Sequence, residues 1–367
     1  MLASDLMGQK MINSNNKQPL VSICIPTYNV EKTIAETLTS IINQTYKNLE
    51  IIISENASTD NTLTILNEFN DPRIKIHITS KTILAEKNFG RCIELANGDY
   101  IAIFHADDLY NPYMVEKQVQ AFHDDPSIGA VFTMADYIDI HGEIIGEHKL
   151  PFELKGNNVY SFLEILTSIL RNGNFLMCPS AMVRSKIYKQ LSIFDVERFG
   201  TSSDLDMWLR ILKKHPIAIL DEKLMRYRIS NMQGGAIYNY LRLDEADFFK
   251  VIDFHLLAET CTNLKTLSSS LNTYEFQRFD DNIQRAVNYI LKGQSQNAKK
   301  LLKESFSTNV FLVAMSHFKK PKLLAVLIFG LMLLSSTYFG LEWYLSKFYH
   351  KYRCRKSANH HNPTKRE

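Results

Sequence analysis

The stretch YIAIFHADD, from Tyr100 to Asp108, decides the fold of this 367-residue chain. Five apolar residues typical of a buried strand are followed, after His105 and Ala106, by two adjacent carboxylates, and Pro112 follows where a helix would begin. Open α/β sheets bind ligands at the carboxyl ends of their strands, so the pair would lie in a ligand crevice. Mg²⁺ or Mn²⁺ suits such a pair, because it takes one or two carboxylates together with phosphate oxygens and water. The alternative is a turn whose aspartates cap the next helix.

The hundred residues before this stretch alternate short apolar runs with helical periodicity. Leu20–Ile25, stopped by Pro26, and Leu49–Ile53 are predicted to be buried strands. Arg73–Ile78 alternates polar and apolar residues, as an edge strand does. Helices between the strands would make βαβ units, so the sequence predicts an α/β fold with a mostly parallel sheet. The loops after the first two strands then share one edge with the aspartate pair.

Composition narrows the class of protein. With 45% hydrophobic residues the chain has an ordinary globular content, and its net charge of +3 gives no reason to expect nucleic-acid binding. Five cysteines are scattered without a C-x-x-C spacing, which fits reduced thiols in a cytosolic protein better than a disulfide framework. Residues 1–19 contain Asp5 and Lys10 and lack the apolar region of a secretory signal, so we expect a disordered lead-in.

A second acidic pair, Asp204 and Asp206, stands just before an apolar helical stretch. Together with the features above it completes four motifs: Val21–Asn29, Ile53–Thr62, Ala96–Asp108 and Asp204–Arg210. In this order and spacing they resemble the family-2 glycosyltransferases of the GT-A fold, over about residues 20–230. The resemblance implies a nucleotide-binding sheet flanked by helices.

The resemblance also implies which side chains bind the nucleotide of a sugar donor. Thr27 and Tyr28 would contact the nucleotide, with Tyr28 stacked on its base. Glu55 and Asn56 would hydrogen-bond the base or the ribose. Many relatives carry an acidic residue in place of Asn56, and an amide both donates and accepts, so the base preference stays open. Asn88 either lines the pocket or lies on the surface of its helix.

The metal ligands and the catalytic base follow from the same resemblance. Asp107 and Asp108 would bind the Mg²⁺ or Mn²⁺ that holds the donor's diphosphate, with Asp108 as the direct ligand. His105 stands where relatives often have another Asp, and a ligand role for its imidazole is an alternative. Asp204 would accept the proton of the acceptor hydroxyl in a single displacement that inverts the anomeric centre, with Asp206 positioning or perturbing it. The alternative is that Ser202-Ser203-Asp204 simply caps the helix that follows.

One departure from the family lies near residue 230. Relatives often carry a His shortly after Tyr-Arg, where it can approach the metal or the diphosphate. Here Tyr-Arg-Ile is followed by Ser230, which cannot supply an imidazole. We expect Arg226 or Arg228 to neutralise phosphate instead.

The chain beyond the catalytic region is expected to be helical and membrane-associated. We expect a GT-A domain over 20–235, a helical extension over 236–318, and an apolar segment with a basic tail over 319–367. Residues 323–341 are uncharged, have about the length that crosses a bilayer, and are flanked by basic residues on both sides. A crossing would send the more basic end outside, against the positive-inside tendency. We therefore favour a monotopic or re-entrant insertion at the cytoplasmic face, with a single crossing and a buried core helix as alternatives.

Together these features predict an inverting, metal-dependent glycosyltransferase. It would move a sugar from a nucleoside diphosphate sugar to a hydroxyl of a glycan or lipid-linked acceptor, in cell-surface polysaccharide synthesis. Two alternatives stay open, a nucleotidyltransferase and an inactive, membrane-tethered binding module of the same fold. The missing Gly-rich phosphate loop disfavours the first, and the retained Asp107, Asp108 and Asp204 disfavour the second.

Overall fold

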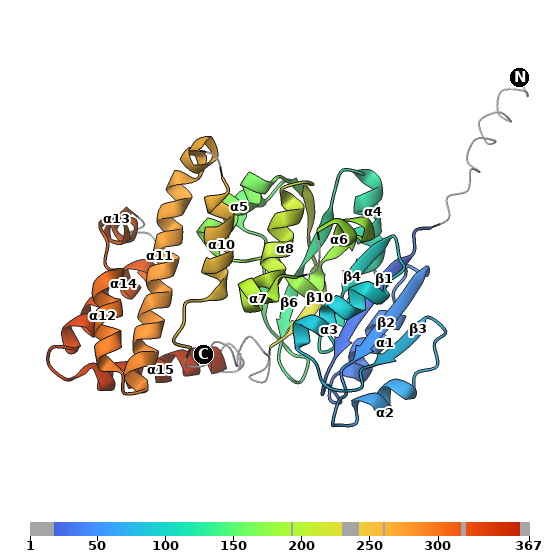
Figure 1. Ribbon diagram of the computed structural model, residues 1–367, viewed down its shortest axis with the longest axis horizontal. Coiled ribbons are helices and arrows are strands. Elements are labelled where there is room, and N and C mark those ends of the chain that lie inside the picture. Colours follow the sequence, from blue (N-terminus) through green and yellow to red (C-terminus); the bar gives the residue numbers. More distant parts are fainter. Residues whose placement is uncertain (1–17, 192–193, 230–241, 260, 317–320, 360–367) are drawn as a thin grey trace, which may run out of the picture.

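The computed structural model describes residues 18–191, 194–229, 242–259, 261–316 and 321–359. A sheet flanked by helices forms one end of the molecule, and a bundle of helices forms the other (Figure 1). The strands are β1 Val21–Thr27, β2 Leu49–Glu55, β3 Ile74–Ile78, β4 Tyr100–Ile103, β5 Leu109–Tyr110, β6 Ala130–Ile138, β7 Ile144–His148, β8 Val159–Tyr160, β9 Met182–Arg184 and β10 Ile217–Arg228. Their order in the sheet is β3-β2-β1-β4-β9-β6-β10-β5, with β7 beside β6 and β8 beside β10.

The strands nearest the candidate site are parallel, as expected. β1 lies between β2 and β4 and pairs with both in parallel, and β3 is the edge strand that its alternating sequence predicts. β9 runs antiparallel between β4 and β6, and β5, β7 and β8 are antiparallel to their neighbours. The sheet is therefore mixed rather than mostly parallel, because the short strands β5, β7, β8 and β9 each run antiparallel to their neighbours.

β1 does not stop at Pro26, as the sequence suggested, but continues to Thr27. The carbonyl of Cys24 accepts a hydrogen bond from the N–H of Phe104 at 2.9 Å, and the ladder between β1 and β4 ends at Cys24. Pro26 lies two residues further on, so its nitrogen faces the same side, past the end of that ladder. The proline therefore costs the sheet no hydrogen bond.

Helices cover both faces of the sheet. They are α1 Ile34–Ile42, α2 Thr62–Asn67, α3 Ala85–Leu95, α4 Met114–Asp124, α5 Phe162–Asn172, α6 Ser185–Leu191, α7 Val196–Phe199 and α8 Ser203–Leu212, with 3₁₀ turns η1 Phe152–Leu154, η2 Cys178–Ser180 and η3 Gly200–Ser202. α1, α2 and α4 bury one apolar core against the sheet, with Leu38 and Met114 among its residues. α3, α5, α6 and α8 bury the core on the opposite face, with Ile165 and Trp208 among its residues.

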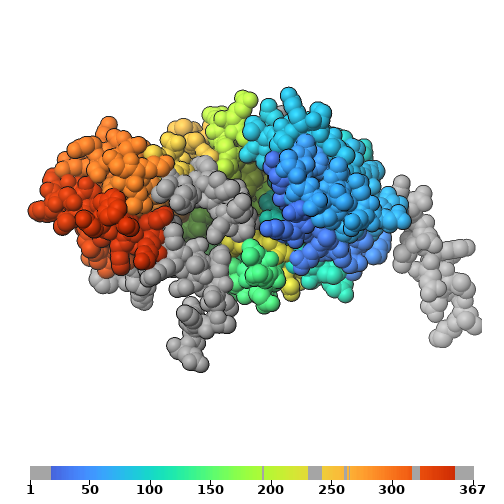
Figure 2. Space-filling view, turned by 90° about the horizontal axis from the view of Figure 1, so that it is seen from below, coloured from blue at the N-terminus to red at the C-terminus, as the bar shows by residue number. Residues whose placement is uncertain are grey.

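The C-terminal helices are α10 Asp247–Leu257, α11 Cys261–Leu291, α12 Ser295–Ser305, α13 Thr308–Ser316, α14 Pro321–Ser336 and α15 Glu342–Asn359. Figure 2 shows the later ones as a lobe at the opposite end from the N-terminal half. α10 belongs with the sheet, because its Phe249, Val251 and Ile252 lie in the same core as Trp208. The other helices bury a third core of their own. The expected domain boundary at residue 235 lies outside the described residues and stays a prediction.

The uncharged run 323–341 is not one helix. α14 ends at Ser336, a turn through Gly340 (φ +69°) follows, and α15 begins at Glu342. Leu327 and Leu333 of α14 are buried in the third core. None of the described helices is long and apolar enough to cross a membrane.

Candidate active site

The loops that follow β1 and β2 hold each other in place. Asn29 Oδ1 accepts from the N–H of Thr59 at 2.8 Å, and the N–H of Asn29 donates to Ser58 Oγ at 3.0 Å. Each loop contains a non-glycine residue in the left-handed region, Asn29 at φ +50° and Ala57 at φ +53°. Residues held in this region cost free energy and cluster at functional sites, so the geometry supports a ligand site here.

Tyr28 and Thr27, both predicted to contact the nucleotide, differ in their exposure. Tyr28 is 45% exposed at the carboxyl edge of the sheet, where its ring is available for stacking on a base. Thr27 is buried, and its hydroxyl donates to the carbonyl of Ile25 at 3.0 Å. Nucleotide contact stays a prediction for both, and Tyr28 is the one that presents a surface.

Glu55 and Asn56 are buried and bonded to the protein itself. The carboxylate of Glu55 accepts from the N–H groups of Ala57 at 3.1 Å and Ser58 at 2.7 Å. The amide of Asn56 donates to the carbonyl of Ile83 and accepts from its N–H, both at 2.9 Å. Glu55 thus shapes its own loop, and Asn56 ties that loop to the segment before α3. Their contact with base or ribose stays a prediction, and a ligand would have to share these hydrogen bonds.

Asn88 is buried, so the alternative of a helix-surface residue is wrong. It is not among the residues that line the cavity described below, and its contact with the nucleotide stays a prediction. Its Oδ1 accepts from Ser54 Oγ at 2.6 Å, and its Nδ2 donates to the Ser54 carbonyl at 2.8 Å. Asn88 therefore fastens α3 to β2. The residues of α3 that line the cavity described below are Ala85, Glu86 and Phe89. The sequence alone does not mark these three residues, because the side of a helix that faces a cavity depends on what packs against the helix.

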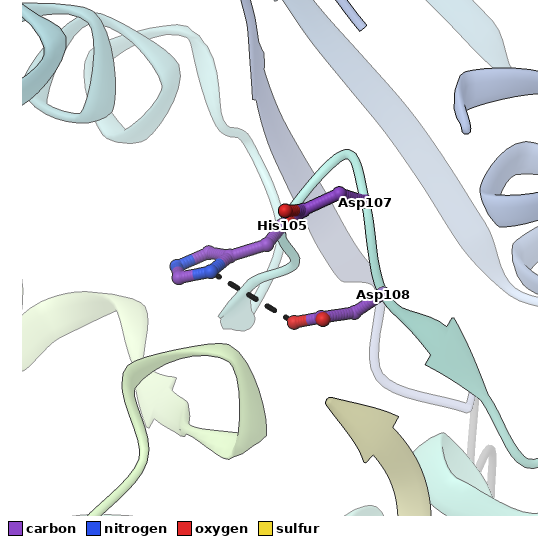
Figure 3. Close-up of side chains that lie close together, drawn as sticks. All are labelled: His105, Asp107 and Asp108. Carbon is purple, nitrogen blue, oxygen red and sulfur yellow. Dashed lines mark ion pairs between the residues drawn. The ribbon is translucent and has the colours of Figure 1, made fainter. Parts of the chain in front are cut away.

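His105, Asp107 and Asp108 converge on one point (Figure 3). One ligand atom of each lies within 4.8 Å of the others, and His105 Nδ1 is 3.8 Å from Asp108 Oδ2. Asp108 is fully buried, and its Oδ1 accepts from the N–H of Arg228 at 2.8 Å. Its Oδ2 has no hydrogen-bond partner among the described residues. A buried, unpaired carboxylate oxygen is costly unless a cation binds it, so these residues fit a divalent metal ion.

Burial sets the charges in this cluster. Burial and the nearby charge of Asp107 raise the pKa of Asp108 well above its usual range, against the lowering effect of Arg228. Burial lowers the pKa of His105, against the opposing charge of Asp107. Neutral imidazole is the form that binds metals, and a metal ion can displace the proton of a carboxyl group. The lowered pKa of His105 therefore favours the form that binds a metal, whereas a cation would have to displace the proton that the raised pKa of Asp108 favours.

The structure excludes the capping alternative for the aspartate pair. α4 begins only at Met114, with Tyr113 at its N-cap, whereas Asp108 bonds the backbone of β10. Asp108 therefore does not cap a helix, and a role as a metal ligand is compatible with its position.

Arg228 hydrogen-bonds the loop that contains Asp107 and Asp108. Its guanidinium donates to the carbonyls of Asp107 at 2.8 Å and Asp139 at 3.0 Å, and to Glu36 Oε2 at 2.8 Å. Arg228 is only 4% exposed, whereas Arg226 is exposed. A phosphate contact stays a prediction for both arginines. Ser230 lies outside the described residues.

Asp204, in the first turn of α8, lines a cavity of about 220 Å³. Burial raises the pKa of Asp204 to about 6, while the N–H of Leu205, which donates to its Oδ1 at 2.7 Å, lowers it. Ser202 takes the N-cap position but makes no side-chain cap hydrogen bond, and Asp204 instead accepts from an N–H of the first turn. The role of Asp204 as the base stays a prediction. The other residues that line the cavity are Ala85, Glu86, Phe89, His105, Cys178, Phe194, Gly200, Thr201 and Ser203. The candidate base therefore shares this cavity with His105 of the metal cluster, whereas Asp107 and Asp108 are not among the residues that line it.

Asp206, the neighbour of the candidate base, is buried elsewhere. It is 1% exposed and does not line the cavity. Its Oδ2 accepts from Arg210 Nε at 2.8 Å, and its Oδ1 lies 3.0 Å from His255 Nε2. These contacts support the positioning alternative for Asp206.

The mixed sheet with helices on both faces has the GT-A type of fold. The family model for glycosyl transferase family 2 matches residues 22–192. The chain is 35% identical over 224 residues to an uncharacterized glycosyltransferase of Methanocaldococcus jannaschii, an alignment that spans 58% of this chain and 72% of that protein. The chain therefore belongs to glycosyltransferase family 2. It is also 31% identical over 239 residues to the chondroitin synthase of Escherichia coli, which covers 64% of this chain and 32% of the synthase.

Solved structures share the fold. Staphylococcus aureus TarS, in complex with UDP-GlcNAc, has a TM-score of 0.58 at 17% identity and covers 90% of this chain and 91% of its own. The mannosyltransferase PcManGT of Pyrobaculum calidifontis, in complex with GDP-Man and Mn²⁺, has a TM-score of 0.51 at 15% identity and covers 87% and 88%. At these identities the likeness concerns the fold alone.

Proposed function

We propose that this enzyme transfers a sugar from a nucleoside diphosphate sugar to a hydroxyl of a glycan or lipid-linked acceptor, with inversion, in cell-surface polysaccharide synthesis. The observation that carries the proposal is the cavity that Asp204 shares with His105 of the metal cluster. The named activity of the chondroitin synthase supports a saccharide acceptor. The complexes of the two solved structures, with UDP-GlcNAc and with GDP-Man and Mn²⁺, support a nucleotide-sugar donor.

Asp204 would take the proton of the acceptor hydroxyl. With a pKa of about 6 it is mostly ionised at neutral pH, and it is more basic than an ordinary aspartate. The hydroxyl would attack the anomeric carbon as the nucleoside diphosphate leaves from the opposite side, and such a single displacement inverts the centre. Asp107 and Asp108 would hold the cation, with His105 beside them. When bound, Mg²⁺ or Mn²⁺ would neutralise charge on the departing diphosphate.

The test is transfer itself. The purified enzyme is incubated with Mn²⁺, UDP-GlcNAc, UDP-glucose or GDP-mannose, and a panel of oligosaccharide and lipid-linked acceptors, and release of nucleoside diphosphate is measured. We expect acceptor-dependent release with one donor, a product whose anomeric configuration is inverted by NMR, and loss of both in Asp204→Asn. Asp99→Asn, at the opposite edge of the sheet, is the matched control and should transfer normally. Retention of configuration, or full activity in Asp204→Asn, would refute the proposed mechanism.

We also propose that the C-terminal lobe attaches the enzyme to the cytoplasmic face of a membrane. An apolar hollow of about 710 Å³ lies between α14 and α15. The large side chains that line it include Leu331, 40% exposed, Tyr344, 68% exposed, and Phe348, 71% exposed. Beside it, Lys347 Nζ lies 4.6 Å from the ring centre of the exposed Trp343. Apolar and aromatic side chains next to lysines suit the interface of an anionic bilayer.

Vesicle flotation tests this attachment. The full chain should float with phosphatidylcholine vesicles that contain phosphatidylglycerol and much less with phosphatidylcholine alone. The double substitution Tyr344→Ala with Phe348→Ala should release it. Phe152→Ala, which removes an 86% exposed aromatic ring from the catalytic part, is the matched control and should not. Failure of the unaltered chain to float with anionic vesicles would contradict attachment through this surface.

A further inference from the structure

We propose that α10, which lies beyond the residues matched by the family model, positions the catalytic base through contacts on both sides of Asp204. The inference rests on the proposed function, because it takes Asp204 as the base. α10 spans Asp247–Leu257 and lies against α8 and η3, the two elements that meet at the base.

The first contact fixes the turn before the base. Asp247 Oδ2, at the start of α10, accepts from the N–H and the hydroxyl of Thr201, both at 3.0 Å. Thr201 lines the cavity with Asp204. Gly200 makes this approach feasible, because it has φ +50° and a Cβ there would lie 2.4 Å from Asp247 Oδ2. A side chain at position 200 would therefore push Asp247 away from the turn.

The second contact fixes the helix after the base. His255, near the end of α10, lies with its Nε2 3.0 Å from Asp206 Oδ1, and both side chains are 1% exposed. The carboxylate can only accept, so the proton of this hydrogen bond lies on Nε2. Arg210 Nε binds the other oxygen of Asp206 at 2.8 Å. Asp206 is therefore held from both sides, two residues after the base.

α10 is itself firmly placed, so its contacts can transmit position. Val251 and Ile252 are fully buried in the core shared with α8. On the other side of the helix, Asp253 accepts from the hydroxyl of Tyr274 at 2.8 Å and pairs with Arg278 at 2.6 Å, both on α11. The position of the Asp204 carboxylate thus depends on a helix that is held by the core on one side and by α11 on the other. α10 itself contributes no residue to the lining of the cavity.

Asp247 and His255 are therefore positioning residues. A general base works only where its oxygen meets the attacking hydroxyl, and a misplacement of about 1 Å can cost about 100-fold in rate. Loosening either contact should lower the turnover of the bound donor. It should leave nucleotide binding unchanged, since the hydrogen bonds of Asn29, Glu55 and Asp108 described above are made within the two loops and to β10.

The test compares Asp247→Ala and His255→Leu with the full-length enzyme. We expect kcat for transfer to fall about 10- to 100-fold, with donor KM and the affinity for UDP or GDP in Mn²⁺ within about twofold of the unaltered enzyme. His255→Gln should recover most of the rate, because its amide N–H can donate to Asp206. Leu257→Ala, which removes an 87% exposed side chain at the end of α10, is the matched control and should retain normal transfer. Amide hydrogen exchange over residues 199–206 should be faster in the two test variants and unchanged over 21–55.

Three results would overturn the inference: normal kcat in both test variants, no rescue by His255→Gln, or equal losses of kcat and nucleotide affinity, which would indicate general unfolding. A different result would remove the proposed function, namely an unaltered enzyme that neither binds nucleotides nor transfers sugar. In that case, amide hydrogen exchange over residues 199–206 still tests whether α10 holds this segment in place. Faster exchange in the variants would support the hold of α10 on this segment, and unchanged exchange would refute it.

Discussion

Asp204→Asn is expected to make the enzyme more stable and inactive at the same time. The substitution keeps the size of the side chain and an oxygen that can accept from the N–H of Leu205. It removes the charge that burial disfavours and the only form of the group that can accept a proton. Stability and activity should therefore change in opposite directions.

The magnitude follows from the pKa shift. The pKa of Asp204 rises from 3.8 to about 6 on folding, and at 1.36 kcal/mol per pKa unit this corresponds to about 3 kcal/mol. Because the folded pKa is the higher one, the folded state is most stable below pH 3.8, where the carboxyl group is neutral in both states. It loses stability as the pH rises through 6, by the same total of up to about 3 kcal/mol. Above pH 6 the charged carboxylate costs the folded state up to about 3 kcal/mol, and asparagine carries no such cost.

The assay is denaturant unfolding of the unaltered enzyme and Asp204→Asn at pH 5 and pH 8, together with transfer rates from pH 5 to 8. The variant should be more stable by up to about 3 kcal/mol at pH 8, and its advantage should shrink at pH 5. Transfer by the unaltered enzyme should fall about tenfold per pH unit below about pH 6, and the variant should lose about 10²- to 10⁴-fold. An equal stability difference at the two pH values, or transfer that stays level down to pH 5, would refute this reasoning.

Three further predictions concern the metal cluster and its support. Asp108→Ala should weaken Mn²⁺-dependent binding of UDP or GDP at least tenfold by calorimetry, because it removes the buried ligand oxygen; equal binding with and without the carboxylate would contradict the metal assignment. His105→Asp should shift the preference from Mn²⁺ toward Mg²⁺ in the same titration if the imidazole is a ligand, because imidazole suits transition metals better than Mg²⁺; an unchanged preference would exclude that role. Asn88→Ala should destabilise the fold by about 2 kcal/mol in denaturant unfolding, since it leaves Ser54 without two buried hydrogen bonds, while nucleotide affinity stays unchanged.

The strands around the site could be predicted because their signals are local. A buried apolar run identifies β1, β2 and β4 wherever they lie in the sheet, and the carboxylates at 107 and 108 follow shortly after the end of β4 at Ile103. The extent of β1 could not be predicted in the same way. Whether Pro26 ends the strand depends on where the ladder with β4 stops, which is a property of the neighbour.

The supporting residues of the site escaped prediction because their partners are distant in sequence. Asp247 and Thr201 are separated by 46 positions, and His255 and Asp206 by 49. Nothing in the local pattern around Asp247 or His255 marks a link to the base. Likewise, Asn88 is polar, as a surface or pocket residue would be. Only the packing of α3 on β2 shows that it is buried and hydrogen-bonded to Ser54.

The C-terminal segment shows the limit of an argument from hydrophobic length. The run 323–341 was long enough to suggest a membrane helix, but Ser335, Ser336 and Gly340 stand where α14 ends and a turn begins. One side of α14 completes the third core with Leu327 and Leu333, and another side remains exposed. A hydropathy count cannot separate these two sides, because the helix is apolar on both.

The measurement that tests the central claim most directly is titration calorimetry with UDP, GDP and dTDP, each with and without Mn²⁺. The enzyme should bind one of these nucleotides in the presence of Mn²⁺, lose that binding with chelator and in Asp108→Ala, and keep it in Asp204→Asn. This pattern would separate a metal-dependent donor site from a base that acts only in transfer. Failure to bind any of the three nucleotides with either metal state would contradict the claim and favour an inactive binding module of the same fold.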